Sequence, residues 1–334
     1  MYPDATGAFR SAHYISDPPP GSGAAYAQYF DAQGAHACSL GARVEVDIGE
    51  SEIYADTCGL PRDLAHVREL PGPILPILFV VPNVSNGESA ISADAAREVL
   101  GNGGHVAPWL NPALFFVRGT GTATTRLIGL AIDVPVPAQK FWGTDQGTAE
   151  KLAANLSAVQ DPSEAHGAIG ILGADFYDQN KLSLKALAFQ AKGQLCAYLP
   201  DSSLNTRDKI NVRDGHYPIW GLLHFFAALG SDGLPSDTSL AFMRLFAEPL
   251  SLEMLDAFIE ASWVPNCAMM VERDAELGDL TADTPSHPCG CHFDVKVSPS
   301  GKVPDGCKAC KSNNDCDDPR KPSCNFGYCE VEGK

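Results

Sequence analysis

The sequence has little positive charge. Its 334 residues include 24 Lys and Arg against 41 Asp and Glu, which gives a formal net charge of −17 at pH 7. Nucleic acids and anionic membrane surfaces are bound through basic patches, so we expect neither as a partner. A small anion is not excluded. Local hydrogen bonds and dipoles decide a buried anion site, whereas the field of distant charges is screened beyond roughly 10 Å at ordinary salt.

Long hydrophobic runs are also missing. The longest candidate, "PGPILPILFVVP" at 71–82, is interrupted by Pro73 and Pro76 and falls short of the roughly 20 apolar residues of a membrane span. The first residues, "MYPDATGAFR", contain neither a basic n-region nor an apolar h-region. We therefore expect a chain that does not span a membrane and that carries no signal peptide.

Aliphatic residues are scarce near the end of the chain, where cysteines gather. Eight of the 11 cysteines lie between Cys267 and Cys329, and the segment 289–330 is rich in Gly, Pro, Asn and Asp. Such a segment cannot form a core and must be ordered by cross-links. Disulfides are the favoured interpretation because eight cysteines form four pairs, and they indicate an oxidising compartment: periplasmic, cell-surface or secreted.

Zinc is the alternative cross-link in this segment. The "C-x-C-H" and "C-x-x-C" pieces offer possible metal ligands, namely Cys289, Cys291, His292, Cys307 and Cys310. A four-ligand zinc site would leave Cys316, Cys324 and Cys329 unexplained. We therefore predict no metal site, and no motif in the sequence predicts a cofactor.

A glycine-rich loop lacks the lysine of a nucleotide-binding P-loop. In "FFVRGTGTATTRLIGLAIDVP", residues 115–135, no Lys follows the last glycine of the loop. What remains is an apolar strand, an arginine, and a hydroxyl-rich turn that opens a helix. Backbone N–H groups and the hydroxyls of Thr122, Thr124 and Thr125 could hold an anion there. An ordinary strand-to-helix turn explains the same pattern.

Catalytic patterns are weak. Ser22 in "GSG" does not match the G-x-S-x-G of hydrolases, so an enzyme is not expected.

His216 follows Arg213 and Asp214 and fits either an acid–base group or, more simply, a structural turn. His224 is expected in the core. Three tryptophans could line a ligand cleft or pack in the core, which is the commoner use of the residue: Trp109, Trp142 and Trp220.

Short apolar runs alternate with helical patterns, which predicts an α/β fold. We expect strands at 44–49, 74–81, 114–118 and 168–172, and two strands within 184–199 joined by a turn at Lys192 and Gly193. Helices are expected at 91–101, with Ser92 as N-cap, and at 148–160. After Pro218 we expect only helices, at 218–229, 239–247 and 252–263.

The order of four pieces resembles the phosphate-binding-protein branch of the type 2 periplasmic solute-binding proteins. The pieces are "VDIGESEIY", "ILFVVPN", "ISADAAREVLGNGG…PWLNPALFFVRGTGTATT" and "GTDQGTAEKLAANLSAVQDPSEAHGAIGIL", and they span about Val44 to Ala228. The resemblance implies two α/β lobes that clamp a ligand and perform no chemistry. The lobes would comprise 1–82 with 200–285, and 83–199, followed by a cysteine-rich tail at 286–334.

The resemblance also implies a ligand and its contacts. The family expectation is phosphate or a similar small anion, held in a cleft lined by 51–52 and 118–124, with an ABC transporter permease as a possible partner. By position, the ligand-binding residues become Ser51, Glu52, Arg118, Thr122, Ala123 and Thr124. Two departures stand out: Glu52 replaces the family Asp, and Thr-Ala-Thr replaces Ser-Gly-Thr.

The beginning of the chain differs from the family. Family members begin with a strand, a ligand-binding loop and a helix, whereas some 40 residues rich in Gly, Pro and Ala precede the first motif here. We expect either an N-terminally incomplete chain or a diverged one, with Ser22 as a candidate for a second ligand loop. Cys38 and Cys58 could pair across this motif, which leaves Cys196 without a cysteine partner.

An extracellular structural or interaction protein on the same fold is the alternative function.

Overall fold

The backbone forms two compact units, Met1–Asp47 and Ile48–Lys334. A computed structural model describes residues 2–3, 9–10, 12–14, 25–31, 34–40, 48–58, 67–84, 87–119, 121–134, 141–246, 249–298 and 301–334. Side chains are described from Ile48 onward, with the exception of Cys58.

The first unit contains short antiparallel strands. β1 (Tyr2–Pro3) pairs with β2 (Phe9–Arg10), and β4 (Ala25–Asp31) lies between β3 (Ala12–Tyr14) and β5 (Gly34–Leu40). These strands were not predicted from the sequence. Ser22 lies outside the described residues. The side chains of Cys38 and Cys58 are likewise not described, so their disulfide stays a prediction.

A seven-stranded mixed sheet forms the centre of the second unit. Its order is β10-β9-β11-β7-β14-β6, and β12 also pairs with β7. The strands are β6 (Ile48–Ser51), β7 (Val67–Pro82), β9 (Phe115–Val117), β10 (Thr144–Asp145), β11 (Ile169–Gly173), β12 (Leu184–Ala186) and β14 (Trp220–Ala228). A separate parallel pair is formed by β8 (Ala90–Ser92) and β13 (Ala188–Gln190). The predicted mixed α/β fold is confirmed.

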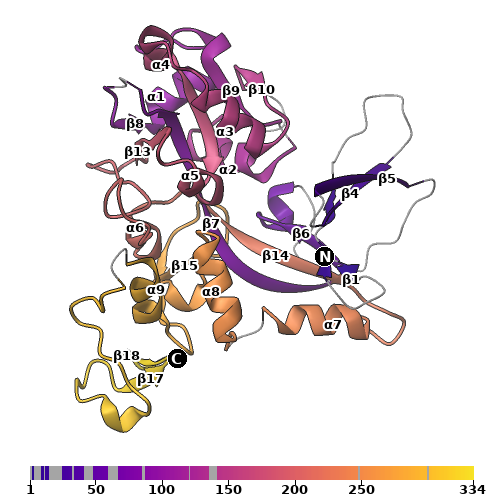
Figure 1. Ribbon diagram of the computed structural model, residues 1–334, viewed down its shortest axis with the longest axis vertical. Helices are drawn as coiled ribbons and strands as arrows, with labels where there is room; N and C mark the ends of the chain where they lie inside the picture. The colour runs from indigo at the N-terminus through magenta and orange to yellow at the C-terminus, as the bar shows by residue number, and fades with distance from the viewer. Residues whose placement is uncertain are drawn as a thin grey trace. The chain divides into compact units, whose positions relative to one another are not determined.

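β7 connects the two ends of this sheet (Figure 1). Its first part pairs with β14, from Val67 to Pro76, and its second part pairs with β11 and β12. Residues 72–82 are all buried. A strand covered on both faces reads as a continuous apolar run, and the sequence has this pattern at 74–81. The prediction of a strand there is confirmed.

Helices cover the faces of the sheet, and most begin at a hydroxyl or carboxylate cap. They are α1 (Ala93–Ala96), α2 (Ala123–Ala131), α3 (Ala149–Ser157), α4 (Pro162–Gly167), α5 (Ala174–Gln179), α6 (Ile210–Arg213), α7 (Asp237–Arg244), α8 (Leu252–Glu260) and α9 (Gly290–Val297). Ser92 caps α1 as predicted, accepting a hydrogen bond from the Ala95 N–H, and a π turn at Arg97–Gly101 extends this helix. The predicted helices at 148–160, 239–247 and 252–263 are confirmed as α3, α7 and α8.

The helix predicted at 218–229 is wrong, because this segment forms strand β14. Its sequence, "PIWGLLHFFAAL", is apolar almost throughout, and such a run fits a buried helix or a buried strand equally well. Pairing partners decide between them. β14 lies between β7 and β6 and hydrogen-bonds to both, with an irregularity between Leu222 and His224.

The tail is held by four disulfides, as predicted. They join Cys267 to Cys289, Cys291 to Cys307, Cys310 to Cys324, and Cys316 to Cys329. Each of these eight sulfurs is bonded to another sulfur. None of them is therefore a thiolate that could bind zinc, as the alternative interpretation requires. The short hairpin of β17 (Ser323–Asn325) and β18 (Tyr328–Glu330) is the main regular structure after α9, and β15 (Val271–Glu272) pairs with β16 (Thr281–Ala282) ahead of it.

Candidate functional site

The glycine-rich loop forms a capped strand-to-helix turn between β9 and α2. The Thr122 hydroxyl accepts a hydrogen bond from the Thr125 N–H at 3.3 Å and donates to the Gly119 carbonyl at 3.0 Å. The Thr125 hydroxyl donates to the Arg118 carbonyl at 3.0 Å. These two hydroxyls therefore fix the shape of the turn. The ligand role predicted for the Thr122 hydroxyl would require it to share this capping bond.

Two backbone donors remain at the start of α2. Ala123 and Thr124 are the first residues of this nine-residue helix, and no carbonyl one turn earlier in the helix can accept from their N–H groups. The helix dipole places partial positive charge at the same end. Helix N-termini of this kind stabilise anions in general, and the anion site at this one stays a prediction.

Arg118 stands directly after β9, at the same turn. Its Nε is buried and has no hydrogen-bond acceptor among the described residues. A buried charged donor without an acceptor costs free energy, which an anionic acceptor from outside the chain would recover. Arg118 therefore adds a formal positive charge to the helix terminus.

The first sequence motif packs against α2. Ser51, at the end of β6, donates from its hydroxyl to the Ile53 carbonyl at 2.8 Å and thereby turns the chain. Arg126 of α2 donates to the Thr57 carbonyl at 3.2 Å. The structure thus brings the 51–57 segment and the first turns of α2 together, although the two lie more than 60 residues apart in sequence.

Gly221 marks the closest approach of this segment to β14. A methyl group added at Gly221 would overlap the Glu52 carbonyl oxygen and would lie 3.0 Å from Leu127 Cδ1 on α2. Only glycine leaves room for the backbone of the first motif at this point. The position of Glu52 is therefore set by β14 as well as by its own strand.

Glu52 lies in an unusual electrostatic environment. Burial, reinforced by the carboxylates of Asp175 and Glu50, raises its pKa to about 7, while Arg118 acts in the opposite direction. Burial also raises the pKa of Asp175 to about 6. Asp175 is the second residue of α5, directly after β11, and its Oδ1 is buried without a hydrogen-bond partner among the described residues. Asp175 does not stand out in the sequence, because an acid in the first turn of a helix is common.

The site therefore combines two kinds of group. Arg118 and the start of α2 carry positive charge, while Glu52 and Asp175 are acids whose pKa values are raised to about 7 and about 6. Such a combination can bind an oxyanion that shares a proton with a carboxyl group, because one oxygen then donates while the others accept.

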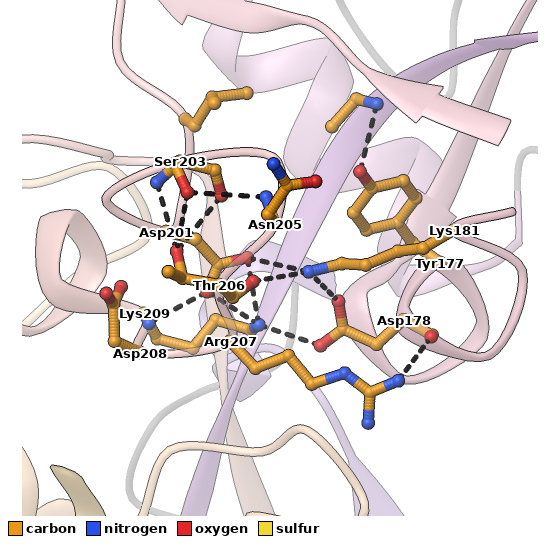
Figure 2. Close-up of polar contacts among 12 residues, drawn as sticks. Tyr177, Asp178, Lys181, Asp201, Ser203, Asn205, Thr206, Arg207, Asp208 and Lys209 are labelled. Carbon is orange, nitrogen blue, oxygen red and sulfur yellow. Dashed lines mark hydrogen bonds and ion pairs between the residues drawn. The ribbon is translucent and has the colours of Figure 1, made fainter. Parts of the chain in front are cut away.

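A second polar cluster lies in the core below α5 (Figure 2). Lys209 is 1% exposed, and its Nζ lies 2.8 Å from Asp178 Oδ2 and 2.9 Å from Asp201 Oδ1. Lys181 lies 2.9 Å from Asp178 Oδ1 and also donates to the Thr206 carbonyl at 2.5 Å. These mutual contacts use the charged groups fully, so the cluster is a structural network. No local sequence pattern predicts this network.

The histidines and tryptophans singled out in the sequence have mainly structural places. His216 is exposed in the turn after α6, with its Nδ1 2.8 Å from Asp214 Oδ1. His224 is buried as predicted, but on strand β14, where its Nδ1 lies 2.5 Å from Glu69 Oε1. Trp109 packs in the core, and Trp142 is about half exposed at 52%. Trp220 is buried beside a cavity.

Sequence comparison finds no matching family model and no matching curated protein. Solved structures do match in shape. A possible phosphate binding protein from Planctomyces limnophilus is 16% identical, with a TM-score of 0.45, over 66% of this chain and 76% of that chain. A putative phosphate ABC transporter substrate-binding protein with bound phosphate from Clostridium perfringens is 13% identical, with a TM-score of 0.47, over 66% and 79%.

A third match is an ABC-type phosphate transport receptor from Vibrio cholerae, 12% identical, with a TM-score of 0.43, over 66% of this chain and 80% of that chain. Among the helices of the described residues, none has both the length and the apolar character needed to cross a membrane. The chain carries four disulfides in its C-terminal part.

Proposed function

We propose that this protein binds a small, protonatable oxyanion, phosphate first among them, at the N-terminus of α2, and that it performs no chemistry on it. In this proposal Arg118 and the N–H groups of Ala123 and Thr124 hold the negative oxygens. Ser51 and Glu52 approach from the first motif. The four disulfides are typical of an oxidising compartment, so we place the protein in the periplasm, at the cell surface or outside the cell.

One observation carries the proposal: the buried Arg118 Nε has no acceptor among the described residues, at the end of a helix that itself attracts anions. In a structural turn, a buried guanidinium nitrogen would be expected to find a carbonyl or carboxylate. An anion at this place would satisfy the guanidinium and the helix terminus together.

The two acids favour phosphate over sulfate. Sulfate carries no proton near pH 7, so it can approach Glu52 and Asp175 only when these are protonated. Hydrogen phosphate brings its own proton and can donate it to an ionised carboxylate. Glu52, with a pKa of about 7, is divided between its two forms at neutral pH. We therefore expect phosphate to bind across pH 6–8 and sulfate to bind progressively more weakly as the pH rises.

Calorimetry of the whole chain with phosphate, sulfate and acetate tests the proposal. Arg118→Ala removes a charge-assisted contact worth about 1.5–3 kcal/mol, which corresponds to roughly a ten- to hundredfold loss of phosphate affinity. Arg118→Lys should recover part of this loss, because lysine keeps the charge without the planar fork.

Arg97→Ala is the matched control, since Arg97 is an exposed arginine on another helix. It should leave phosphate binding unchanged. If the wild-type chain binds none of the three anions, the α2 turn is structural, and the extracellular interaction protein becomes the better interpretation of this fold. A transporter permease as partner belongs to the same proposal and fails with it.

A further inference from the structure

A cavity of about 270 Å³ lies beside β14 and β7. It is smaller than pockets for drug-sized ligands, which measure roughly 300–1,000 Å³, so its occupant would be a small molecule. The lining residues are Tyr54, Ile74, Trp220, Leu222, Asn266, Met269, Val271, Glu272, Arg273 and Asp283.

The cavity is separate from the α2 site. Trp220 and Leu222 are two residues apart on β14 and share a face, and Ile74 lies opposite Leu222 in the register. Gly221, between them, belongs to the other face, where Leu127 of α2 packs. The two sites therefore use opposite faces of β14, and each can be disrupted without the other.

The inner wall of the cavity presents buried donors. Arg273 stacks on the indole of Trp220, with its Cζ 3.4 Å from the ring centroid, and donates through Nη1 to the Pro218 carbonyl at 3.0 Å and through Nη2 to the Trp220 carbonyl. Two further donors, Trp220 Nε1 and Arg273 Nε, are buried and have no acceptor among the described residues. Trp220 and Arg273 are only 3% and 6% exposed.

Burial without an acceptor is unfavourable for both groups. Burial lowers the pKa of Arg273 to about 10, so the guanidinium still carries its charge at neutral pH. Glu276 lies 3.6 Å from Arg273 Nη2 and offsets part of that charge. A ligand acceptor with negative charge, such as a carboxylate, would therefore satisfy the buried donors of the inner wall.

The outer wall of the cavity carries carboxylates in place of hydrogen-bond donors. Glu272 and Asp283 both line the cavity, and the ammonium of Lys334 lies 3.6 Å from Glu272 Oε1 and 2.5 Å from Asp283 Oδ1. A simple anion would meet repulsion from these carboxylates. A ligand that brings a cationic group of its own would instead take the place of Lys334 beside them.

We propose that this cavity binds a small zwitterion of the α-amino-acid type with a short apolar chain. Its carboxylate would accept from Trp220 Nε1 and Arg273 Nε, and its ammonium would lie beside Asp283 and Glu272. The apolar chain would contact the hydrophobic part of the wall, formed by Ile74, Leu222, Met269 and Val271.

Calorimetry with three matched probes tests this assignment on the full chain. Norleucine carries both charges, hexanoate lacks the ammonium, and pentylamine lacks the carboxylate. Norleucine should bind at least tenfold more tightly than either of the others. Absence of norleucine binding at millimolar concentrations, or equal binding of hexanoate, would overturn the proposal.

Substitutions locate the binding. Trp220→Phe keeps an aromatic side chain and removes the N–H donor, so we expect a roughly tenfold loss of norleucine affinity. Trp142→Phe makes the same change at an exposed tryptophan. As the control, it should have no effect on norleucine affinity. Lys334→Ala removes the competing ammonium and should tighten norleucine binding severalfold. If Trp220→Phe does not fold, the Lys334→Ala result decides, and unchanged or weaker binding there contradicts the proposal. Arg118→Ala should leave norleucine binding unchanged, which separates this site from the anion site.

Discussion

Lys209 places its ammonium between two buried carboxylates, 2.8 Å from Asp178 and 2.9 Å from Asp201. Its backbone adopts a left-handed conformation, with φ of 47°, directly before α6. Asp178 comes from the end of α5 and Asp201 from the loop after Pro200. One side chain thus ties three separate segments together. Its removal would leave two buried carboxylates to Lys181 alone among the described residues, at 2.9 Å from Asp178 and 3.5 Å from Asp201.

The first prediction is that Lys209→Met destabilises the protein by about 3–5 kcal/mol, because breaking a buried ion pair leaves an uncompensated buried charge. Urea denaturation followed by circular dichroism measures the change. Lys192→Met is the matched control, since Lys192 pairs with Asp133 where both side chains are about half exposed. Exposed pairs contribute about 0–1 kcal/mol, and an equal loss in the two variants would contradict the structural role of Lys209.

The second prediction concerns Glu52 and pH. Its pKa is raised from 4.5 to about 7 in the folded state, chiefly by burial, so the folded state holds a proton that the unfolded state releases. The contribution of Glu52 to stability is therefore present below pH 4.5 and is lost as the pH rises to about 7.

Glu52→Gln keeps the shape and removes the ionisation. Relative to this variant, the wild type should lose on the order of 2–3 kcal/mol of unfolding free energy between pH 4.5 and 7.5. Chemical denaturation at several pH values measures the difference. Parallel stability profiles of the two proteins would show that Glu52 has an ordinary pKa.

The third prediction concerns the contact at Gly221. Gly221→Ala forces a methyl group against the Glu52 carbonyl, and overpacking of this kind costs typically about 1–3 kcal/mol. Phosphate affinity should fall as well, because the first motif is displaced from α2. Gly49→Ala is the control, since a methyl at Gly49 has nothing within 4 Å. Thermal denaturation and phosphate calorimetry report the two effects, and a neutral Gly221→Ala would refute the contact.

The fourth prediction concerns the tail. Replacing Cys310 and Cys324 by alanine opens a loop with a sequence separation of 14, and disulfides closing loops of about 15 residues contribute roughly 3 kcal/mol. Because the tail has few aliphatic residues, we expect local unfolding there with little change in the sheet. Limited proteolysis with mass spectrometry should find new cleavages confined to residues 301–334. Cys196→Ser, at an exposed free thiol, is the control, and cleavage elsewhere first would contradict the prediction.

Local patterns were sufficient for much of the fold. Ser92 and Thr148 are N-caps that mark where their helices begin. The apolar run at 74–81 indicates a strand buried on both faces. The pattern at 218–229 fails, because a run without a polar face is compatible with helix or strand, and only the pairing of β14 with β6 and β7 distinguishes them. That pairing joins residues more than 140 positions apart.

The candidate site likewise contains some residues that local sequence patterns predict and others that only the tertiary structure brings together. Arg118 and the hydroxyl-rich turn are local features, and the motif order suggested that Glu52 belongs with them. Asp175 could not be found, because its relation to Glu52 depends on how β11 and β6 end in space. Trp220 and Arg273 lie 53 residues apart, and nothing in either local sequence indicates that a guanidinium stacks on that indole.

The long strand β7 has a mechanical consequence. It belongs to the part of the sheet that pairs with β14 and also to the part that pairs with β11, so neither part can rotate against the other without bending it. Pro71, Pro73 and Pro76 lack the N–H group that a ladder requires, and Pro76 is the last residue of β7 that pairs with β14 before β11 becomes the partner. Bending would break fewest hydrogen bonds there, and any opening and closing motion of this molecule would have its axis at that stretch of the strand.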